Sequence, residues 1–203
     1  MKQNVVFNPK PNILSTEKVI LRPLSLEDLD AFYQAGAYPD IWRWSLPDKC
    51  ISKEVTKQWL AYSEEMMKKG EHVAYAIFDK SSGNFVGSTR YCSIKPEDRS
   101  IEIGFTFITP TFQRSYINTH AKFCLLKHAF EELQAIRVEF KTHENNNKSR
   151  TAILRLGASF EGVLRNQRIL SDGSYRNTAI FSIIDSEWLS VKRNLEIKMK
   201  TAC

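Results

Sequence analysis

The segment Pro110–Lys122, PTFQRSYINTHAK, places cations where a helix is expected to begin. Arg114 lies just before the expected helix start, and His120 and Lys122 fall in its first turn. The partial positive charge of a helix N-terminus disfavours cations, whereas its free backbone N–H groups bind anions such as phosphate. The sequence therefore predicts either an anion site in which these cations are counter-charges, or side chains that simply point into water.

Composition limits the class of protein. The chain has 203 residues, and 42% of them are hydrophobic, which is enough for a core in one domain. No run approaches the roughly 20 apolar residues of a membrane span, and the first residues lack the apolar centre of a secretory signal, so we expect a cytoplasmic protein without membrane contact. The four cysteines are far apart and the four histidines lack ligand spacing, so we expect neither disulfides nor a metal.

The net charge of +6 raises the question of an acidic partner. Residues 1–18 carry +2 and residues 189–203 carry +3, which leaves +1 for the body of the chain. A nucleic-acid groove needs cations on the folded surface together with stacking aromatics. We therefore do not expect nucleic-acid binding. The alternative, binding through the tails, predicts an affinity that is lost when 189–203 is removed.

The pattern of elements indicates one domain over 16–188, between an N-terminal tail at 1–15 and a basic C-terminal tail at 189–203 that could be helical. A strand that begins at Lys18 and ends at Pro23 leads into a helix with Ser25 as N-cap and Asp28 three residues later. A second helix begins after Ser52 and ends at Gly70.

Three strands follow, over 72–80, 85–94 and 100–109, and they form an antiparallel meander with a hairpin turn at 81–84. In the third strand, alternation puts Ile101, Ile103, Phe105 and Phe107 on one face.

The second half of the chain contains a crossover. Helical spacing over 119–133 precedes a short strand at 136–142, which would lie parallel to the strand before the helix. A short helix ending at Gly157 and two strands around the Asp172–Gly173 turn complete the order β α α β β β α β α β β. The predicted fold is α/β (α+β), a mixed sheet covered by helices.

This element order and the loop at 110–122 resemble the GNAT superfamily of acetyl-CoA-dependent N-acetyltransferases, and within it the ribosomal-protein N-terminal (Rim-type) enzymes. The matching segments are ILRPLSLEDLDAF, IEIGFTFITPTFQRSYINTHAK, NNKSRTAILRLGASFEG and DGSYRNTAIFSIIDSEW, in the family's order over most of 16–188. The family's loop reads Gln/Arg-x-x-Gly-x-Gly/Ala, and its glycines let the backbone approach a pyrophosphate. Here Tyr116 and Asn118 stand in their places. Asparagine tolerates a left-handed backbone, so we expect Asn118 to hold the tight position of the loop. Tyr116 adopts such a backbone only at a cost, so we also expect a weaker cofactor site or a shifted loop.

The resemblance implies a splayed sheet of seven strands with about four helices, mainly antiparallel and open between the strands at 100–108 and 136–142. Acetyl-CoA would enter this opening as cosubstrate. Its pantetheine arm would bond to the backbone near Ile108, and its pyrophosphate would lie on the loop amides. The implied cofactor residues are Phe107, Ile108, Gln113, Arg114, Ser115, Tyr116, Ile117, Asn118, Thr119 and Asn146.

Acetyl transfer to an amine needs a neutral nucleophile, a stabilised oxyanion and a proton for the leaving thiolate. An α-amino group is partly neutral at pH 7, so a carboxylate or an ordered water suffices as its base. Glu161, which matches a Glu-Gly motif of the Rim type, is the first candidate, and Glu102, on the strand lining the cleft, is the second. Ser149 is either a helix N-cap or a hydroxyl near the thiolate. The N–H near Ile108 is the expected oxyanion donor.

The acceptor, a protein N-terminus or a small amine, is expected on the loop with Trp42 and Trp44 and on the strands with Arg90, Arg165 and Arg168. If the arginines face the cleft, they favour an acceptor with a carboxylate or phosphate; the tryptophans could instead be packing lids. The missing glycines leave a second function open, a non-catalytic acyl-CoA-binding module. An exposed late strand would allow a homodimer.

Overall fold

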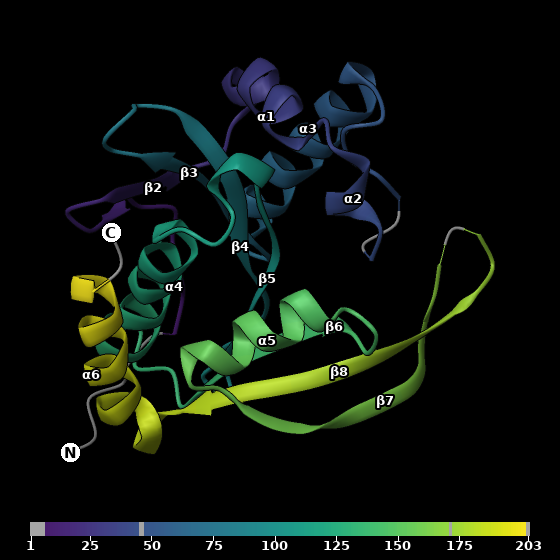
Figure 1. Ribbon diagram of the computed structural model, residues 1–203. Coiled ribbons are helices and arrows are strands. Elements are labelled where there is room, and N and C mark those ends of the chain that lie inside the picture. The colour runs from purple at the N-terminus through teal and green to yellow at the C-terminus, as the bar shows by residue number, and fades with distance from the viewer. Residues whose placement is uncertain (1–6, 45–46, 171, 202–203) are drawn as a thin grey trace.

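A single mixed sheet forms the centre of the protein in the computed structural model, which describes residues 7–44, 47–170 and 172–201 (Figure 1). In the described residues the strand order is β1-β2-β3-β4-β5-β6-β8-β7, and every neighbouring pair is antiparallel except β5 and β6. The strands are β1 Leu14–Ser15, β2 Val19–Pro23, β3 Val73–Asp79, β4 Phe85–Lys95, β5 Ser100–Ile108, β6 Arg137–His143, β7 Ser159–Ile169 and β8 Tyr175–Ile184. The predicted fold class is confirmed, with the two-residue β1 as an eighth strand.

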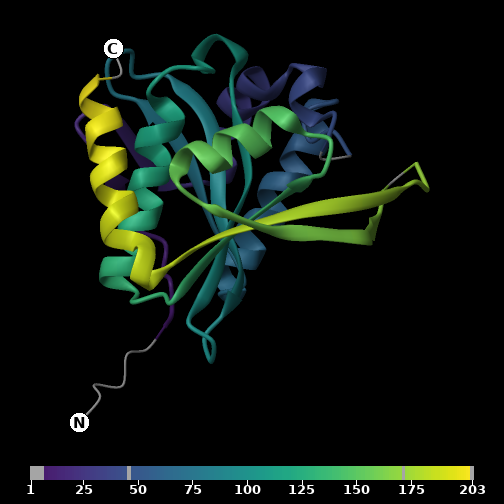
Figure 2. The same ribbon diagram turned by 60° about the horizontal axis from the view of Figure 1, so that its bottom comes forward.

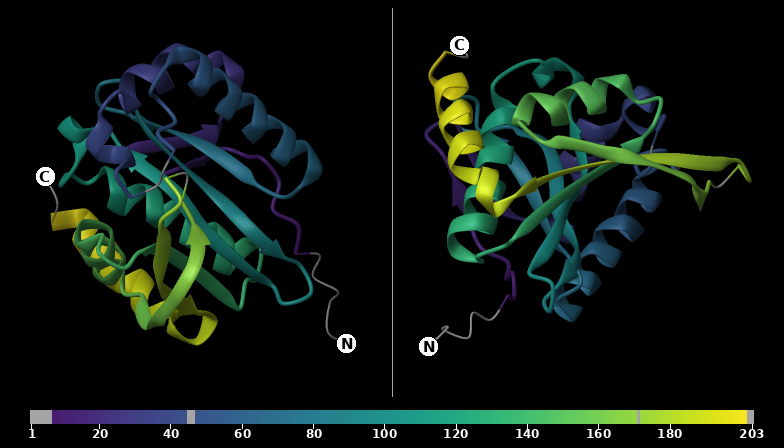
Figure 3. Two further views of the ribbon diagram at one scale, coloured as in Figure 1. Left: turned by 90° about the vertical axis from the view of Figure 1, so that its right-hand side faces the viewer. Right: turned by 90° about the horizontal axis from the view of Figure 1, so that it is seen from below.

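The helices cover the sheet on both faces. They are α1 Leu29–Gly36, α2 Pro39–Trp42, α3 Lys53–Lys69, α4 Ile117–Lys127, α5 Asn147–Leu156 and α6 Asp185–Thr201, and a π-helical turn, His128–Glu132, continues α4. Buried hydrophobic residues of α4, α5 and α6 lie in one core cluster, and buried hydrophobic residues of α1, α2 and α3 lie in the other together with Phe107 of β5. Figure 3 shows α1–α3 together on one side of the sheet and α6 alongside α4 on the other.

Local sequence signals account for most helix ends. The Asp28 carboxylate accepts a hydrogen bond from the Ser25 N–H at 3.0 Å, and Ser52 Oγ accepts one from Val55 N–H at 3.2 Å. Gly70 and Gly157 end their helices at φ of 74° and 99°, a left-handed conformation that costs glycine little. These predictions are confirmed.

The N-cap of α5 differs from the prediction. Asn146 Oδ1 accepts from Ser149 N–H at 3.1 Å, so Asn146 caps the helix and Ser149 lies inside its first turn. Asparagine is among the best N-cap residues, and the polar run before the helix offered several candidates for the position.

The sheet opens between β5 and β6. These strands pair only over Ser100–Glu102 and Arg137–Glu139; beyond that, β5 continues beside β4 and β6 continues beside β8. The predicted opening is therefore present.

A bulge in β5 corrects the predicted alternation. The β4–β5 register shifts between Ser88 and Arg90, and Phe105 has φ of 49° and is 45% exposed. Ile103 packs in the first core cluster, whereas Phe107 packs in the second, on the opposite face. The extra residue of a bulge reverses which face the following side chains occupy.

Both predicted tails contribute to the core. Phe7 is buried near the N-terminal end, and Trp188, Val191 and Leu195 of α6 are buried with it in the first core cluster. The Trp188 ring stacks on Phe130 at 5.2 Å between centroids. The boundaries expected at 15/16 and 188/189 therefore do not separate tails from the domain in the described residues.

The β7–β8 hairpin extends well beyond the body of the molecule (Figure 2). β7 lies at one edge of the sheet and is exposed along nearly its whole length. Pairing of this strand with a second copy of the chain remains a prediction. Among the described helices, none combines the length and apolarity needed to span a bilayer.

Candidate active site

The unpaired half of β5 presents backbone groups to the opening. Thr109 N–H donates to Val86 O on β4 at 2.9 Å. Because successive residues of a strand direct their backbone groups to opposite sides, the N–H and C=O of Ile108 point away from β4, toward the opening. Gln113 Nε2 donates to Ile108 O at 3.0 Å, so this carbonyl is reachable from the loop. Ile108, for which the resemblance implies contact with the pantetheine arm and the oxyanion, therefore directs its backbone groups to the opening.

The loop after β5 delivers free amides to the start of α4. Within the described ranges, no acceptor is found for the N–H groups of Arg114, Ser115, Tyr116, Asn118 and Thr119, while Ile117 N–H donates to Ser115 Oγ at 3.3 Å. Clustered free N–H groups at a helix N-terminus suit a phosphate. The stretch predicted to hold the pyrophosphate therefore has the donors for it.

The left-handed residue of the loop is Arg114, at φ of 60°, and not Asn118, which lies inside α4. Tyr116 has an ordinary helical φ of −67° and stores no strain. The expectation about Asn118 is wrong because the helix begins at Ile117, two residues before the predicted start.

Tyr116 braces the loop against the β3–β4 turn. Its hydroxyl donates to Asp79 Oδ1 at 2.7 Å, and the Lys18 amine lies 4.6 Å from its ring centroid. Burial alone would raise the pKa of Asp79, but hydrogen bonds from Ser81, Tyr116 and Ser82 outweigh it and lower that pKa. Tyrosine in the glycine position thus anchors the loop.

Two of the three cations in the opening segment turn inward. His120 is fully buried, and its Nδ1 is 2.9 Å from Thr16 Oγ1; burial lowers its pKa. Lys122 is also buried, and its Nζ donates to Thr89 Oγ1 at 3.0 Å and to Thr106 Oγ1 at 2.6 Å. Neither side chain is a counter-charge for an anion at the helix start, and neither points into water, so both predicted alternatives are wrong for these two residues. Arg114 is exposed and is the cation that suits this role.

Glu102 lies at the last paired residue before the opening. Its Oε2 accepts from Ser93 Oγ at 3.0 Å and from Lys141 Nζ at 2.9 Å. Its Oε1 has no hydrogen-bond partner among the residues that the structure describes. One oxygen is thus held in place and the other is available to take a proton.

Glu161, on β7, is committed to an ion pair. Arg137 contacts both of its oxygens, with Nη1 to Oε1 at 2.7 Å, and Ser182 Oγ also donates to Oε1 at 2.7 Å. The hydrogen bond from Arg137 lowers the pKa of Glu161 to about 2. A carboxylate with this pKa takes up a proton poorly at pH 7, so the geometry favours Glu102 as base.

Comparison with known proteins identifies this architecture. Residues 18–159 match the family model described as an acetyltransferase (GNAT) domain. The chain belongs to the GNAT acetyltransferase family. A GCN5-related N-acetyltransferase from Brucella melitensis has 28% identity and a TM-score of 0.87, with 95% of this chain and 87% of that chain covered. The uncharacterized N-acetyltransferase YoaA of Bacillus subtilis is 22% identical over 172 residues, 85% of this chain and 96% of its own length.

The fold is also that of a Rim-type protein. RimJ of Mycobacterium smegmatis, solved in complex with CoA-disulfide, has a TM-score of 0.77 at 22% identity, covering 94% of this chain and 95% of that chain. The resemblance to GNAT and Rim-type enzymes is confirmed. Family membership gives the general chemistry: this GNAT chain is an acetyl-CoA-dependent N-acetyltransferase. In the described part of the chain, no group of three or more potential metal ligands comes together.

On the acceptor side of this GNAT domain, the two tryptophans differ. Trp42 is buried, its Nε1 donates to Gly36 O at 2.8 Å, and its ring packs on Phe107 at 5.3 Å. The Trp44 ring lies 4.7 Å from that of His143, the last residue of β6. Trp42 is therefore a packing residue, whereas Trp44 brings its loop to the far side of the opening.

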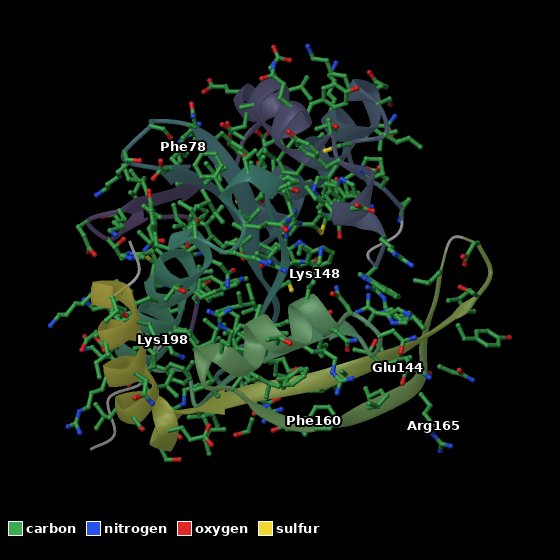
Figure 4. The ribbon with its side chains drawn as sticks, in the orientation of Figure 1. Phe78, Glu144, Lys148, Phe160, Arg165 and Lys198 are labelled. Atoms are coloured by element: carbon green, nitrogen blue, oxygen red, sulfur yellow. The ribbon has the colours of Figure 1, made fainter. Side chains whose placement is uncertain are left out.

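The predicted arginines also separate. Arg90 is only 1% exposed. Its guanidinium lies 4.3 Å from the centroid of the Trp59 ring and 4.9 Å from that of the Phe105 ring, so these two rings cover it. Arg165 on β7 points outward, away from the body, as Figure 4 shows, so the condition that the arginines face the cleft is not met at this position. Trp59 and Phe105 were not predicted beside this site, because a helix face determines the position of Trp59 and the β5 bulge that of Phe105.

Two predicted residues lie at the start of α5. Asn146 uses its Oδ1 for the helix cap. Ser149 is half-buried, and no partner of its hydroxyl is found in the described residues. A free hydroxyl is consistent with the sharper of its two predicted roles, a proton donor near the thiolate.

Proposed function

We propose that the protein transfers the acetyl group of acetyl-CoA to a primary amine, on a protein N-terminus or a small molecule, by direct attack in a ternary complex. One observation carries the proposal: the opening between β5 and β6 has the outward-facing N–H of Ile108 on its β5 edge and the free Oε1 of Glu102 at its closed end. Oxyanion stabilisation and removal of a proton from the amine both need groups of these kinds.

In this proposal the pantetheine arm extends along β5 past Phe107 and bonds to the outward-facing backbone groups of Ile108. The pyrophosphate lies on the free amides from Arg114 to Thr119, with the Arg114 side chain as counter-charge. The Ile108 N–H donates to the carbonyl oxygen of the thioester as negative charge develops there. Asn146 and the start of α5 close the other side.

The chemical step needs one proton acceptor and one donor. The neutral amine attacks the thioester carbonyl, and Glu102 Oε1, directly or through a water, takes the proton that the nitrogen loses. The C–S bond then breaks, and the thiolate leaves with a proton from Ser149 or solvent. This assigns Glu102 as base in preference to Glu161, whose oxygens are held by Arg137.

The test combines binding with turnover. Calorimetry with coenzyme A and thiol release from acetyl-CoA are measured with a panel of amines and N-terminal peptides, and mass spectrometry follows the product. We expect binding and turnover of at least one acceptor. Binding without turnover of any amine would favour the alternative, a non-catalytic acyl-CoA-binding module, which the substituted loop glycines motivate. No heat with coenzyme A at millimolar concentration would refute both.

A further inference from the structure

Four cations beside the opening lack an acidic partner. They are Lys49 on the loop between α2 and α3, Arg90 on β4, Arg168 on β7 and Arg176 on β8. Within the described ranges none of the four forms an ion pair. Neighbouring Arg137 and Lys141, in contrast, each bind two carboxylates. Arg137 and Lys141 are thus neutralised by carboxylates, whereas the four cations beside them have no carboxylate partner in the described residues.

The four cations form two pairs on neighbouring elements: Trp44, on the loop of Lys49, contacts His143, which pairs with Thr178, two residues from Arg176. The Lys49 amine lies 4.7 Å from the Trp59 ring centroid, and the Arg90 guanidinium contacts the same ring at 4.3 Å. Arg168 and Arg176 are cross-strand partners in the β7–β8 hairpin. Burial, then Arg90 and Arg168, lower the pKa of Lys49, and burial, then Arg168, lower that of Arg176. Each of the four cations is therefore close enough to at least one other for electrostatic repulsion between them.

The arrangement is costly without an anion. Arg90 and Arg176 are buried, and the Nε of each has no hydrogen-bond partner. The other bonds of Arg90 go to neutral groups: Nη2 donates to Ser63 Oγ at 2.9 Å, and Nη1 lies 3.3 Å from His72 Nδ1. Burial and Arg90 lower the pKa of His72 to about 4, so its ring is neutral at pH 7. A buried charge without a partner of opposite sign is costly, so an anion bound beside these arginines would offset their desolvation and mutual repulsion.

The nearest carboxylates do not supply this charge. Asp48, beside Lys49, accepts from Cys50 N–H at 2.7 Å and forms no ion pair in the described structure. Glu102 partly offsets the lowering of the pKa of Arg176 by burial, but it pairs with Lys141 and forms no ion pair with Arg176 in the described structure. An anion from outside the chain is the remaining source.

The cation group borders the place where an acceptor would attack. Phe105, at the bulge of β5, lies against Arg90 on one side, and it is followed by the residues, no longer paired with β6, that lead to Ile108. Arg168 is exposed and Lys49 is half-buried, so both remain accessible. The loop that carries Lys49 also carries Trp44, which contacts His143 at the end of β6.

We infer that the acceptor of this enzyme carries an anionic group, a carboxylate or a phosphate, which Lys49 and Arg168 bind while Arg90 and Arg176 add charge behind them. The inference rests on the proposed function, because it places the acceptor amine at the same opening. The cations also assist the chemistry, since positive charge nearby lowers the pKa of an amine and favours its neutral, nucleophilic form.

The test compares acceptors that differ in one charge. Peptides with the same N-terminal residue, followed by aspartate or by asparagine, and by phosphoserine or by serine, are assayed for kcat/KM by thiol release. The wild type is expected to prefer the acidic member of a pair at least tenfold. Lys49→Gln and Arg168→Gln are expected to reduce the preference below threefold, while Arg165→Gln, on the same strand but pointing outward, keeps it. Equal turnover of the paired peptides would overturn the inference while leaving the acetyltransferase intact.

Two further readouts separate the outcomes. If no peptide is acetylated, calorimetry of the same peptides with the CoA-bound protein measures the anion preference alone: tighter binding of the acidic member supports the inference, and equal or absent binding refutes it. Thermal unfolding of Lys49→Gln and Arg168→Gln is expected to match or exceed that of the wild type, because like charges are removed. A loss of stability in both would indicate a structural role and contradict the inference.

Discussion

At the scale of single residues, the free oxygen of Glu102 and the two occupied oxygens of Glu161 lead to opposite expectations. We predict that Glu102→Gln lowers kcat at least tenfold with little change in the dissociation constant of coenzyme A, because the amide cannot accept the proton. Glu161→Gln is expected to affect kcat less and to lower thermal stability instead, because Arg137 loses one of its two ionic partners. Steady-state kinetics and calorimetry on both variants check this. A tenfold loss in Glu161→Gln alone would return the role of base to Glu161.

Lys122 gives the protein a pH-dependent stability. Burial lowers the pKa of its amine to about 7, and its hydrogen bonds go to the neutral hydroxyls of Thr89 and Thr106. Between pH 7 and about 10 the unfolded chain holds this proton while the folded protein does not. The free energy of unfolding therefore rises with pH across this window, by up to about 1.4 kcal/mol per unit, and this contribution levels off below pH 7, where both states are protonated.

We predict that Lys122→Met removes this slope and stabilises the protein most, relative to wild type, at pH 6. Urea unfolding between pH 6 and pH 9 measures the difference between the two proteins. Lys127→Met, at an exposed position of the same helix, is the matched control and is expected to leave the slope unchanged. A wild type and a Lys122→Met variant with parallel pH profiles would contradict a depressed pKa for this amine.

At the scale of elements, local signals predict where helices and turns end, but not which way their side chains face. The caps of α3 and the glycine turns were predictable because each depends on a few adjacent residues. Helix α4 was harder: it is buried on nearly all sides, so its polar residues His120 and Lys122 are enclosed too. An amphipathic pattern assumes one solvent face, and α4 has almost none. The bulge at Phe105 depends on pairing with β4, which the periodicity of one strand does not contain.

The start of α4 provides a test in which strain and charge have opposite effects. Arg114 has a left-handed backbone, which costs an arginine roughly 1 kcal/mol, and it is the exposed cation at this helix start. We predict that Arg114→Gly raises stability by about that amount but weakens coenzyme A binding three- to tenfold, because the phosphate loses its counter-charge. Calorimetry and urea unfolding measure the two effects. Arg114→Lys should retain most of the affinity, and a glycine variant that binds as tightly as wild type would place the phosphates elsewhere.

At the scale of the whole molecule, the protein consists of two sheet halves with a weak junction. Strands β1–β5 and β6–β8 are joined by three residue pairs of β5 and β6, supplemented by the packing of α6 against α4. General fold class, element order and the place of this junction could be predicted from the sequence. The acceptor side was predicted only in part: Arg90 and Arg168 were candidates, but Lys49 and Arg176 were not. The α2–α3 loop, β4 and the β7–β8 hairpin are far apart in the chain, and their cations come near one another only in the fold.

A ligand in the opening should therefore join the two halves. With coenzyme A at a hundred times its dissociation constant, we expect the free energy of unfolding to rise by about 2.7 kcal/mol. Hydrogen exchange should slow at Ile108 and over 114–119 on one half, and also over 140–143 of β6 on the other, because the arm would fill the space that separates them. Wild type with and without coenzyme A is compared by exchange mass spectrometry, and Arg114→Gly at equal ligand concentration serves as the weakened-binding control. Protection confined to one half, despite measurable binding heat, would mean that the cofactor lies on the surface of the β5 half and not between the strands.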